Sequence, residues 1–247
     1  MLTCIIQARL SSTRLPGKVL RPLMGAPLLE RQIERILRAK RISQVVVATS
    51  VESSDDAIER FCERLGIACV RGDLHDVLGR FVQVAQKHPS PHYARSTADC
   101  PLADPEVMDH VIAEHLRLGA DYTSNTLVPT SPDGLDFEVF TAEALKIADG
   151  CLKLRSEREH VLSAMHRRSE LRLHNVTTTP DRSSLRWTVD EPRDFDFVEA
   201  IYRELYEINP AFSWQDVLSL LARRPELEAI NTGIRRNAGS LKETNHG

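Results

Sequence analysis

The sequence predicts an α/β protein with a mostly parallel, doubly wound sheet. Short apolar runs rich in β-branched residues alternate with longer segments whose apolar residues recur at helical spacing, as far as about residue 119. Strands that alternate with helices favour parallel pairing, with helices on both faces of the sheet. The 247 residues, of which 42% are hydrophobic, are enough for one large domain with a substantial core.

The elements of the first half have local start and stop signals. Residues 3–6 and 44–49 are short runs without charge that predict buried strands. Residues 53–56 offer an N-cap and an acidic first turn for a helix that runs to residue 65. Gly66 and Gly119 suit helix ends because glycine tolerates a left-handed backbone. The other predicted elements are helices at 28–39, 77–86 and 105–116 and strands at 67–70 and 92–96.

The pattern changes after Tyr122, where turn-forming residues become frequent. We expect an insertion at about residues 127–180 that leaves the sheet, followed by a return to the sheet in a strand at 185–189. One domain is expected over residues 1–232, with a mobile polar tail at 233–247. Within and after the insertion, the predicted elements are strands at 136–140 and 171–176 and helices at 142–148, 155–168, 192–206, 214–221 and 226–230.

Composition narrows the possible functions. A net charge of -3 and a pI of about 6.3 argue against a general nucleic-acid binder. The five cysteines show no Cys-x-x-Cys pair and no Cys–His ligand spacing, so neither a zinc site nor a disulfide framework is expected. An odd number of cysteines without a signal peptide favours the cytoplasm. No apolar run is long enough to cross a bilayer, so no membrane partner is expected.

A polar loop at residues 7–18 follows the first predicted strand directly. It carries Arg9, Arg14 and Lys18, with hydroxyl side chains and a Pro-Gly turn between the charges. Ligands of open α/β sheets bind at the carboxyl ends of the strands. Guanidinium and ammonium groups that converge there, together with hydroxyl and backbone donors, suit phosphate oxygens. A solvated basic loop is the alternative, and the phosphate interpretation is favoured because hydroxyls and a tight turn separate the charges.

Several separated motifs resemble those of sugar cytidylyltransferases. The most similar group is the cytidylyltransferase-like family of spore coat polysaccharide biosynthesis protein F, which is related to CMP-KDO synthetases and acylneuraminate cytidylyltransferases. The resemblance runs from Leu2 to about Asn231 and implies a Rossmann-like, nucleotide-diphospho-sugar transferase-like fold with an inserted lid and dimerisation segment. The motifs are Gln7-Ala8-Arg9 with Ser12-Thr13-Arg14-Leu15-Pro16-Gly17-Lys18, Val46-Val47-Ala48-Thr49, Thr97-Ala98-Asp99-Cys100-Pro101-Leu102, Ser124-Asn125-Thr126, Pro132-Asp133-Gly134-Leu135-Asp136, Ser156-Glu157-Arg158-Glu159-His160 and Arg186-Trp187-Thr188-Val189-Asp190-Glu191-Pro192.

This resemblance implies a Mg²⁺-dependent enzyme that transfers CMP from CTP to a sugar, expected to be acidic, for surface polysaccharide or glycan biosynthesis. Pyrophosphate would be released, and the enzyme would be a homodimer built from residues 136–176. The nucleotide-binding residues would be Gln7, Ala8, Arg9, Ser12, Arg14, Lys18 and Arg80, and the catalytic residues Arg9, Arg14, Lys18, Asp99 and Asp190. For Arg80, a surface position on a helix capped by Asp76 is an equal alternative.

Asp99 and Asp190 each follow a predicted strand, so their carboxylates are expected at the same edge of the sheet. Two such carboxylates can share one Mg²⁺, because this ion prefers oxygen ligands and retains waters. Locally, Asp190 also suits a helix cap, since Pro192 would occupy the first helical turn. The resemblance favours metal binding at both residues, which match metal-binding positions of the family, and one carboxylate can serve both roles.

The predicted insertion and its surroundings supply the residues that we expect to contact the acceptor sugar. Arg155 or Arg158 is available for a sugar carboxylate. The alternative for residues 155–160 is a solvated helix face with salt bridges, and we expect a mixture of the two. The predicted substrate-binding residues are Asn125, Asp133, Asp136, Glu138, Arg155, Glu157 and His160.

Two rival functions stay open at this point. A glycosyltransferase of the same fold would hold its metal with an Asp-x-Asp motif, whereas this chain has Asp99-Cys100-Pro101. A non-catalytic nucleotide-binding subunit would have no physical need for the cationic loop together with both aspartates. Nucleophilic catalysis is disfavoured, because no Ser-His-Asp or Cys-His arrangement has a supporting motif.

Overall fold

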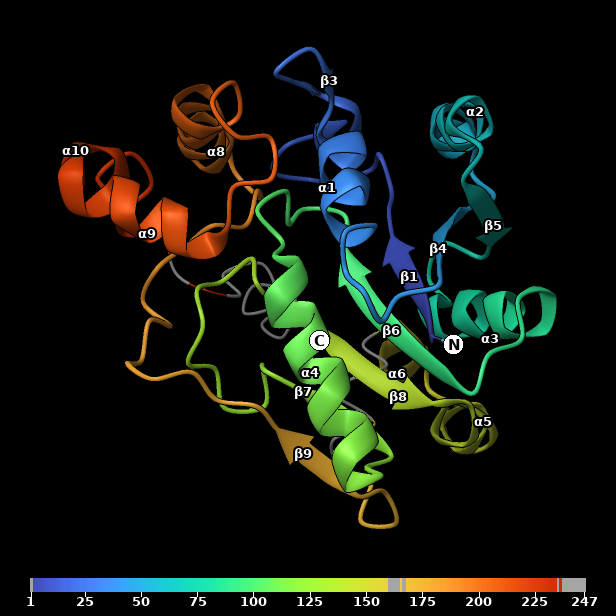
Figure 1. Ribbon diagram of the computed structural model, residues 1–247. Coiled ribbons are helices and arrows are strands. Elements are labelled where there is room, and N and C mark those ends of the chain that lie inside the picture. The colour runs from blue at the N-terminus through green and yellow to red at the C-terminus, as the bar shows by residue number, and fades with distance from the viewer. Residues whose placement is uncertain (1, 160–164, 166–167, 235, 237–247) are drawn as a thin grey trace.

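The computed structural model describes residues 2–159, 165, 168–234 and 236, and one seven-stranded sheet forms its centre (Figure 1). The strands are β1 (Leu2–Gln7), β4 (Gln44–Ser50), β5 (Ala68–Gly72), β6 (His92–Thr97), β7 (Tyr122–Ser124), β8 (Glu138–Thr141) and β9 (Leu173–Asn175), and a separate ribbon joins β2 (Pro22–Leu23) to β3 (Ala26–Pro27). The sheet order is β5-β4-β1-β6-β8-β7-β9. β8 runs antiparallel to both of its neighbours, and the other pairs are parallel. The predicted mostly parallel sheet is therefore confirmed.

Helices cover both faces of this sheet because alternate strand residues point to opposite sides. Ile6 of β1 packs in one core with α1 (Leu28–Ile36), α2 (Asp56–Leu65) and α4 (Pro105–Leu118). Ile5 packs in a second core with α3 (Val77–Lys87) and α5 (Ala142–Cys151). In Figure 1, α4 crosses in front of β8. Gly66 and Gly119 end α2 and α4 with a left-handed backbone, as expected.

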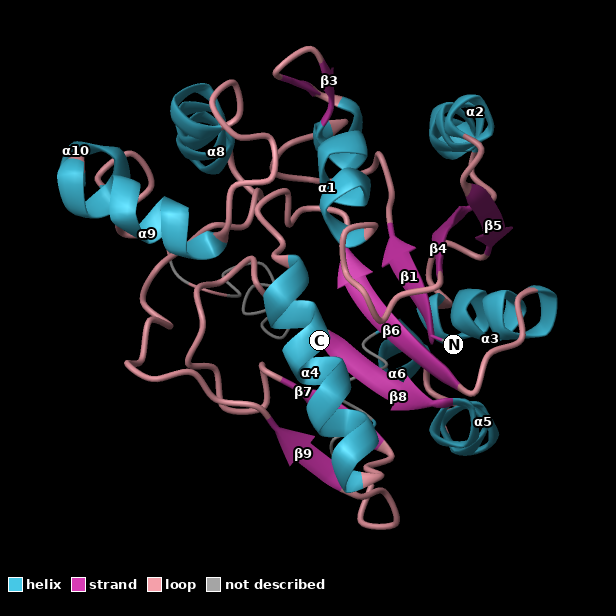
Figure 2. Ribbon diagram, viewed as in Figure 1, coloured by secondary structure: helices cyan, strands magenta, loops and turns pink. Residues whose placement is uncertain are grey.

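The C-terminal helices form a third core beside the main sheet. They are α8 (Pro192–Leu205), α9 (Trp214–Arg223) and α10 (Pro225–Glu228). Phe195 and Val198 of α8 pack with Leu23 and Leu28, at the ribbon and the start of α1. Figure 2 shows the loops after β1 and β6 at the upper end of the sheet, and the loop into α8 meets them there. The short elements η1 (Lys18–Leu20), η2 (Ser53–Asp55) and α6 (Arg155–Glu159) complete the described part of the chain.

The strand expected at residues 185–189 is wrong. This segment makes only an isolated bridge between Asp133 and Arg186. The backbone N–H of Trp187 donates to Asp133 O at 2.6 Å, and that of Val189 donates to Asp99 O at 2.8 Å. These partners lie in loops, so the segment is apolar and buried without being part of the sheet. The close approach requires Gly134, where φ is 113° and a Cβ would lie 2.6 Å from the backbone nitrogen of Thr188.

The segment at 127–180 also differs from the expectation that it leaves the sheet. It supplies β8, which lies between β6 and β7, and β9 at the sheet edge. β7 itself was not predicted from the sequence. Of the helix expected at 155–168, the structure has α6 (Arg155–Glu159), and residues 160–164 and 166–167 lie outside the described part. The part of the expected tail at 237–247 also lies outside it.

Candidate active site

The cationic loop after β1 is held in a curled shape by buried contacts. Asp55 is fully buried, and its carboxylate accepts the N–H of Leu10 at 2.8 Å and the hydroxyl of Ser50 at 2.5 Å. The N–H of Gly17 donates to Leu10 O at 3.0 Å and closes the loop. Gly17 has a φ of 73°, which glycine adopts without strain. The chain thereby turns back and begins η1 at Lys18, beside the carboxyl end of β1.

The side chain of Lys18 joins three distant parts of the chain. Its Nζ lies 3.0 Å from Asp99 Oδ2, 2.9 Å from Asp190 Oδ1 and 2.7 Å from Val189 O. Only 9% of the Lys18 side chain is exposed. An ammonium has three N–H donors, so these three oxygens use all of them. Sequence reasoning placed the three side chains in one site, and the structure brings them together.

The charges in this cluster stabilise one another. Burial works against the ammonium of Lys18, but Asp99 and Asp190 outweigh it and raise the pKa of Lys18. Burial also works against the Asp99 carboxylate, but the charge of Lys18 and hydrogen bonds from Thr97, Lys18 and Cys100 hold its pKa at about 2. Lys18 is therefore a cation and Asp99 an anion at neutral pH.

Asp190 is held by three cations and does not cap α8. Besides Lys18, Arg14 Nη2 lies 3.0 Å and Arg186 Nη2 3.3 Å from Asp190 Oδ2. The N-cap residue of α8 is Glu191, and Asp194 Oδ2 accepts its N–H at 3.0 Å. The alternative of Asp190 as the helix cap is thus not what the structure shows, and its carboxylate stays at the site.

The oxygens around Lys18 Nζ fit a divalent cation. Two carboxylates and the Val189 carbonyl already converge on one positive centre, and hard oxygen ligands are those that Mg²⁺ prefers. Within the described residues, no group of three or more His, Cys, Asp or Glu side chains could hold a metal. Asp99 and Asp190 would therefore hold the ion together with ligands from outside the protein, such as phosphate oxygens and water.

Arg9 and Arg80 form a second group of cations, which differs from the first in having no carboxylate partner within the described residues. Arg9 is exposed, whereas Arg80 is buried and donates to Asp73 O at 2.6 Å and Leu74 O at 2.9 Å. Burial, and then the charge of Arg9, lower the pKa of Arg80. The alternative of a surface Arg80 is wrong, and the two guanidiniums together suit an anion.

The other nucleotide-binding predictions fall on the backbone and the base of the loop. Ala8 is buried, and its N–H donates to Ala48 O at 3.1 Å. The hydroxyl of Ser12 accepts the N–H of Leu15 at 3.4 Å, so it supports the turn. Gln7 lies at the end of β1, where its Oε1 accepts two hydrogen bonds from Arg95. Their direct contact with nucleotide stays a prediction.

Three predicted acceptor residues each have an arginine partner. Asp133 Oδ2 lies 3.1 Å from Arg186 Nη1, Asp136 Oδ1 lies 2.5 Å from Arg236 Nη2, and Glu138 Oε1 lies 3.2 Å from Arg95 Nη1. Burial, and then the charge of Asp136, raise the pKa of Asp133 to about 7. Burial likewise raises the pKa of Asp136 and of Glu138.

The remaining predicted acceptor residues are not gathered in the same way. Asn125 is buried and braces the loop before β8, because its side chain bonds Leu135 O at 2.8 Å and the N–H of Phe137 at 2.9 Å. Arg155 is exposed, and Glu157 accepts the N–H of Leu154 at 3.4 Å. His160 lies outside the described residues. Their sugar contacts stay predictions.

Arg158 is not available for a sugar carboxylate in the way that the sequence suggested. Its guanidinium makes paired contacts with both carboxylate oxygens of Asp76, at 2.9 and 3.0 Å. It also lies 3.0 Å from Asp149 Oδ1. Both anions would have to be displaced before a substrate carboxylate could use this residue.

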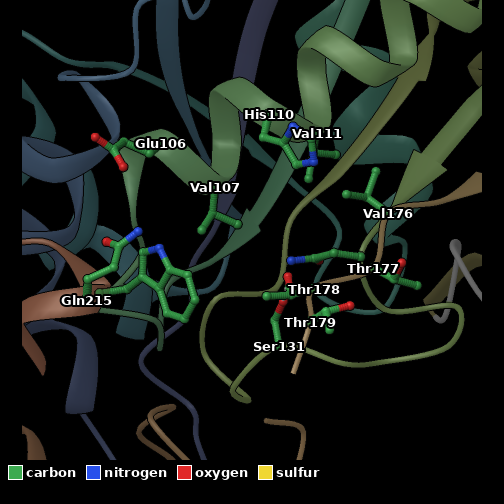
Figure 3. Close-up of a pocket in the computed structure, with 12 residues that line it drawn as sticks. Glu106, Val107, His110, Val111, Ser131, Val176, Thr177, Thr178, Thr179 and Gln215 are labelled. Carbon is green, nitrogen blue, oxygen red and sulfur yellow. Dashed lines mark hydrogen bonds between the residues drawn. The ribbon is translucent and has the colours of Figure 1, made fainter. Parts of the chain in front are cut away.

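A cavity of about 350 Å³ lies on the α4 side, behind the loop that carries Asp133 and Asp136. Figure 3 shows Val107 and His110 of α4 across from Thr178 and Thr179. Asn125 and Ser131 line the cavity from the loop side. None of the predicted catalytic residues lines it.

Four residues of the site were not predicted. Arg95 lies between the buried residues Ala94 and Ser96 of β6, and a charge in the middle of a predicted strand was the signal that could have found it. Asp55 and Arg236 gave no such signal, because each acts on a residue distant in the sequence, Leu10 and Asp136 respectively. Arg186 lies in one of the quoted motifs, but its contact with Asp133 joins residues 53 positions apart.

Comparisons with known proteins agree with this geometry. A family model described as cytidylyltransferase matches residues 3–209. The spore coat polysaccharide biosynthesis protein SpsF of Bacillus subtilis (strain 168) is 34% identical over 230 residues, which cover 90% of this chain and 94% of that protein.

Solved structures show the same fold. A cytidylyltransferase from Leptospira borgpetersenii serovar Hardjo-bovis (strain JB197) is 27% identical with a TM-score of 0.88, over 95% of this chain and 99% of that chain. The CMP:2-keto-3-deoxy-manno-octonic acid synthetase complexed with CTP has 17% identity and a TM-score of 0.63, over 83% of this chain and 99% of that chain. These likenesses confirm the predicted fold class.

Replacing Arg186 tests the buried charges under the site. Arg186→Met should lower the free energy of unfolding by about 3–5 kcal/mol, because it leaves the fully buried carboxylate of Asp194 without its cation. Urea denaturation measures this change. Arg203→Met is the control, since Arg203 pairs with Glu199 on the surface and its loss should change stability by less than about 0.5 kcal/mol. Equal effects of the two substitutions would contradict the assignment.

Proposed function

The chain belongs to the cytidylyltransferase family, and from this premise we propose that it is a Mg²⁺-dependent enzyme that transfers CMP from CTP to an acidic sugar. Membership makes the chain a nucleotidyltransferase, as the sequence predicted. In the proposed reaction, an oxygen of the sugar forms a bond to the α-phosphorus of CTP. The bond from that phosphorus to the oxygen that bridges to the β-phosphorus breaks, and pyrophosphate leaves.

One observation carries the proposal: Asp99 Oδ2 and Asp190 Oδ1 converge within 3.0 Å of a single cationic centre, next to the cationic loop. Phosphoryl transfer depends mainly on positioning and on electrostatic stabilisation, and it requires no covalent intermediate with the protein. A pair of carboxylates beside arginines that lack carboxylate partners suits a bound triphosphate and the ion that accompanies it. A glycosyltransferase or a passive binding subunit would not explain the family match as well.

In the proposed reaction, some residues of the chain would bind the phosphates and others would act at the reacting centre. Arg9 and Arg80 would bind phosphate oxygens, because neither makes an ion pair among the described residues, although the charges of Asp55, Asp76 and Asp73 act on Arg80 from a greater distance. Lys18 and Arg14 would stabilise charge on the departing pyrophosphate. Asp99 and Asp190 would hold Mg²⁺, which when bound neutralises triphosphate oxygens and orients the α-phosphorus.

The acidic acceptor is supported by the names of similar proteins and by an exposed arginine. SpsF is named for polysaccharide biosynthesis, and the CTP complex is of an enzyme for a sugar acid. Arg155 is an exposed cation that a sugar carboxylate could engage, as the sequence predicted. The test is to incubate the pure protein with Mg²⁺, each of the four NTPs and a panel of acidic sugars that includes 3-deoxy-manno-octulosonate. We expect pyrophosphate release with CTP.

Other outcomes of this assay would replace the proposal. Transfer of a sugar from a nucleotide sugar, without pyrophosphate release from any NTP, would establish the glycosyltransferase alternative. Nucleotide binding with neither reaction across the panel would favour the non-catalytic subunit.

Two substitutions test the metal-binding carboxylates. Asp99→Asn and Asp190→Asn should each lower the rate of Mg²⁺-dependent pyrophosphate release by roughly 100-fold or more, because each removes a charge that positions the reactants. Thermal unfolding should show that both variants keep the fold. The matched control is Asp196→Asn, an exposed residue of α8, which should keep full activity. Full activity of both site variants would reject the two-carboxylate site.

The arginines without carboxylate partners give a separate test of phosphate binding. Arg9→Gln and Arg80→Gln should each weaken CTP binding by roughly tenfold or more, the loss of one charge-assisted hydrogen bond. Isothermal titration calorimetry measures the affinity without any acceptor. Arg60→Gln, on the exposed side of α2, is the control and should leave affinity unchanged. The phosphate assignment fails if both site variants bind CTP like the wild type.

We also propose a homodimer that uses residues 136–176 and their surroundings. Large apolar side chains are exposed there: Val128 at 63%, Leu154 at 64% and Leu173 at 38%. Light scattering at micromolar concentration should give about twice the 27.8 kDa chain mass, and Leu154→Asp should shift it toward the monomer. Ile208→Asp is the control, since Ile208 is 85% exposed but lies outside the segment. A monomeric wild type would reject the dimer.

A further inference from the structure

Lys18 occupies the place where an ion held by Asp99 and Asp190 would bind. Its Nζ is bonded to one oxygen of each carboxylate and to Val189 O, at 2.7 to 3.0 Å. A Mg²⁺ ion held by the same oxygens would lie at about 2.1 Å from each of them. The ion and the ammonium would then be in contact, without any anion between them. Two cations repel strongly at that spacing in a partly buried site.

The remaining oxygens of the two aspartates do not offer a second binding position for the ion. Asp190 Oδ2 already contacts Arg14 at 3.0 Å and Arg186 at 3.3 Å. Asp99 Oδ1 lies 3.5 Å from the thiol of Cys100. An ion approaching Asp190 from its other side would therefore meet two guanidiniums. Cations of the chain itself thus neutralise the two carboxylates.

We propose that Lys18 and the divalent ion are alternative partners of the same carboxylates, so that the ion binds only together with the triphosphate. This inference rests on the metal site of the proposed function and adds how that site is controlled. Lys18 has a flexible four-carbon stem, and its ammonium can move from carboxylate to phosphate oxygens without a change of fold. The triphosphate draws Lys18 away, and the two aspartates become free for the ion.

The position of Lys18 on the cationic loop supports this exchange. Lys18 lies on the same loop as Arg9 and Arg14, so a triphosphate that binds this loop comes within reach of its ammonium. Because coupling between two binding events is reciprocal, the nucleotide should raise the affinity for the ion as much as the ion raises the affinity for the nucleotide. A structural pair would instead leave the effect of nucleotide on ion affinity the same with or without Lys18, because the phosphate oxygens contact the ion in both cases.

The experiment measures Mn²⁺ binding to the protein without acceptor, by the electron paramagnetic resonance signal of free Mn²⁺. Without nucleotide, Lys18→Met should bind Mn²⁺ at least about tenfold more tightly than the wild type. Addition of CTP should strengthen Mn²⁺ binding to the wild type by a similar factor and that to Lys18→Met by much less. Lys146→Met is the control, because Lys146 pairs with Glu143 on the surface, and it should behave as the wild type.

The outcomes separate this inference from the proposed function. If Lys18→Met binds Mn²⁺ no more tightly than the wild type, while both bind it in the presence of CTP, the exchange is wrong and the metal site stands. If neither protein binds Mn²⁺ even with CTP, the metal site itself is wrong. Should Lys18→Met fail to fold, Lys18→Gln takes its place, and an effect of CTP on its Mn²⁺ affinity equal to that in the wild type would overturn the exchange.

Discussion

The contact of Lys18 with Asp99 and Asp190 is the interaction on which the arrangement of the site depends. The paired residues are 81 and 172 positions apart in the chain. They tie the loop after β1 to the loop after β6 and to the segment that enters α8. The backbone hydrogen bond from Val189 to Asp99 also joins two of these segments, but the Lys18 ammonium contacts all three. The charge cluster therefore fixes the relative positions of these loops more closely than apolar packing alone.

The cations of the site fall into two kinds, and the difference shows how an acidic chain could bind the proposed triphosphate. Arg14, Lys18 and Arg186 are paired with a carboxylate, which neutralises their charge within the protein. Arg9 and Arg80 lack such partners in the described part of the chain, and burial with mutual repulsion lowers the pKa of Arg80. On the proposed function, local charge without an ion-pair partner, and not the net charge of -3, would determine where phosphate binds.

The sequence was sufficient for features that depend on neighbours in the chain. The strand at β1, the glycine ends of α2 and α4 and the loop of Arg9, Arg14 and Lys18 follow from local pattern. It was insufficient where distant segments decide. Asp190 was placed beside Asp99 on the argument of a strand at 185–189, yet backbone hydrogen bonds to Asp99 and Asp133 hold this segment instead. The pairs of Arg95 with Glu138 and of Arg236 with Asp136 depend on the tertiary fold and have no local signature.

The buried ion pairs of Arg186 are better explained by their effect on the position of Asp190 than by a contribution to the stability of the fold. Removing two charges from water is expensive, and apolar residues of similar size often serve the core equally well. Even so, Asp194 is fully buried against Arg186, and Arg186 reaches on to Asp133 and Asp190. Arg186 thus contacts one oxygen of Asp190, Oδ2, while Lys18 contacts the other, Oδ1. Because Arg186 keeps Asp190 in place, the carboxylate could exchange Lys18 for a metal ion without moving. The proposed exchange requires this.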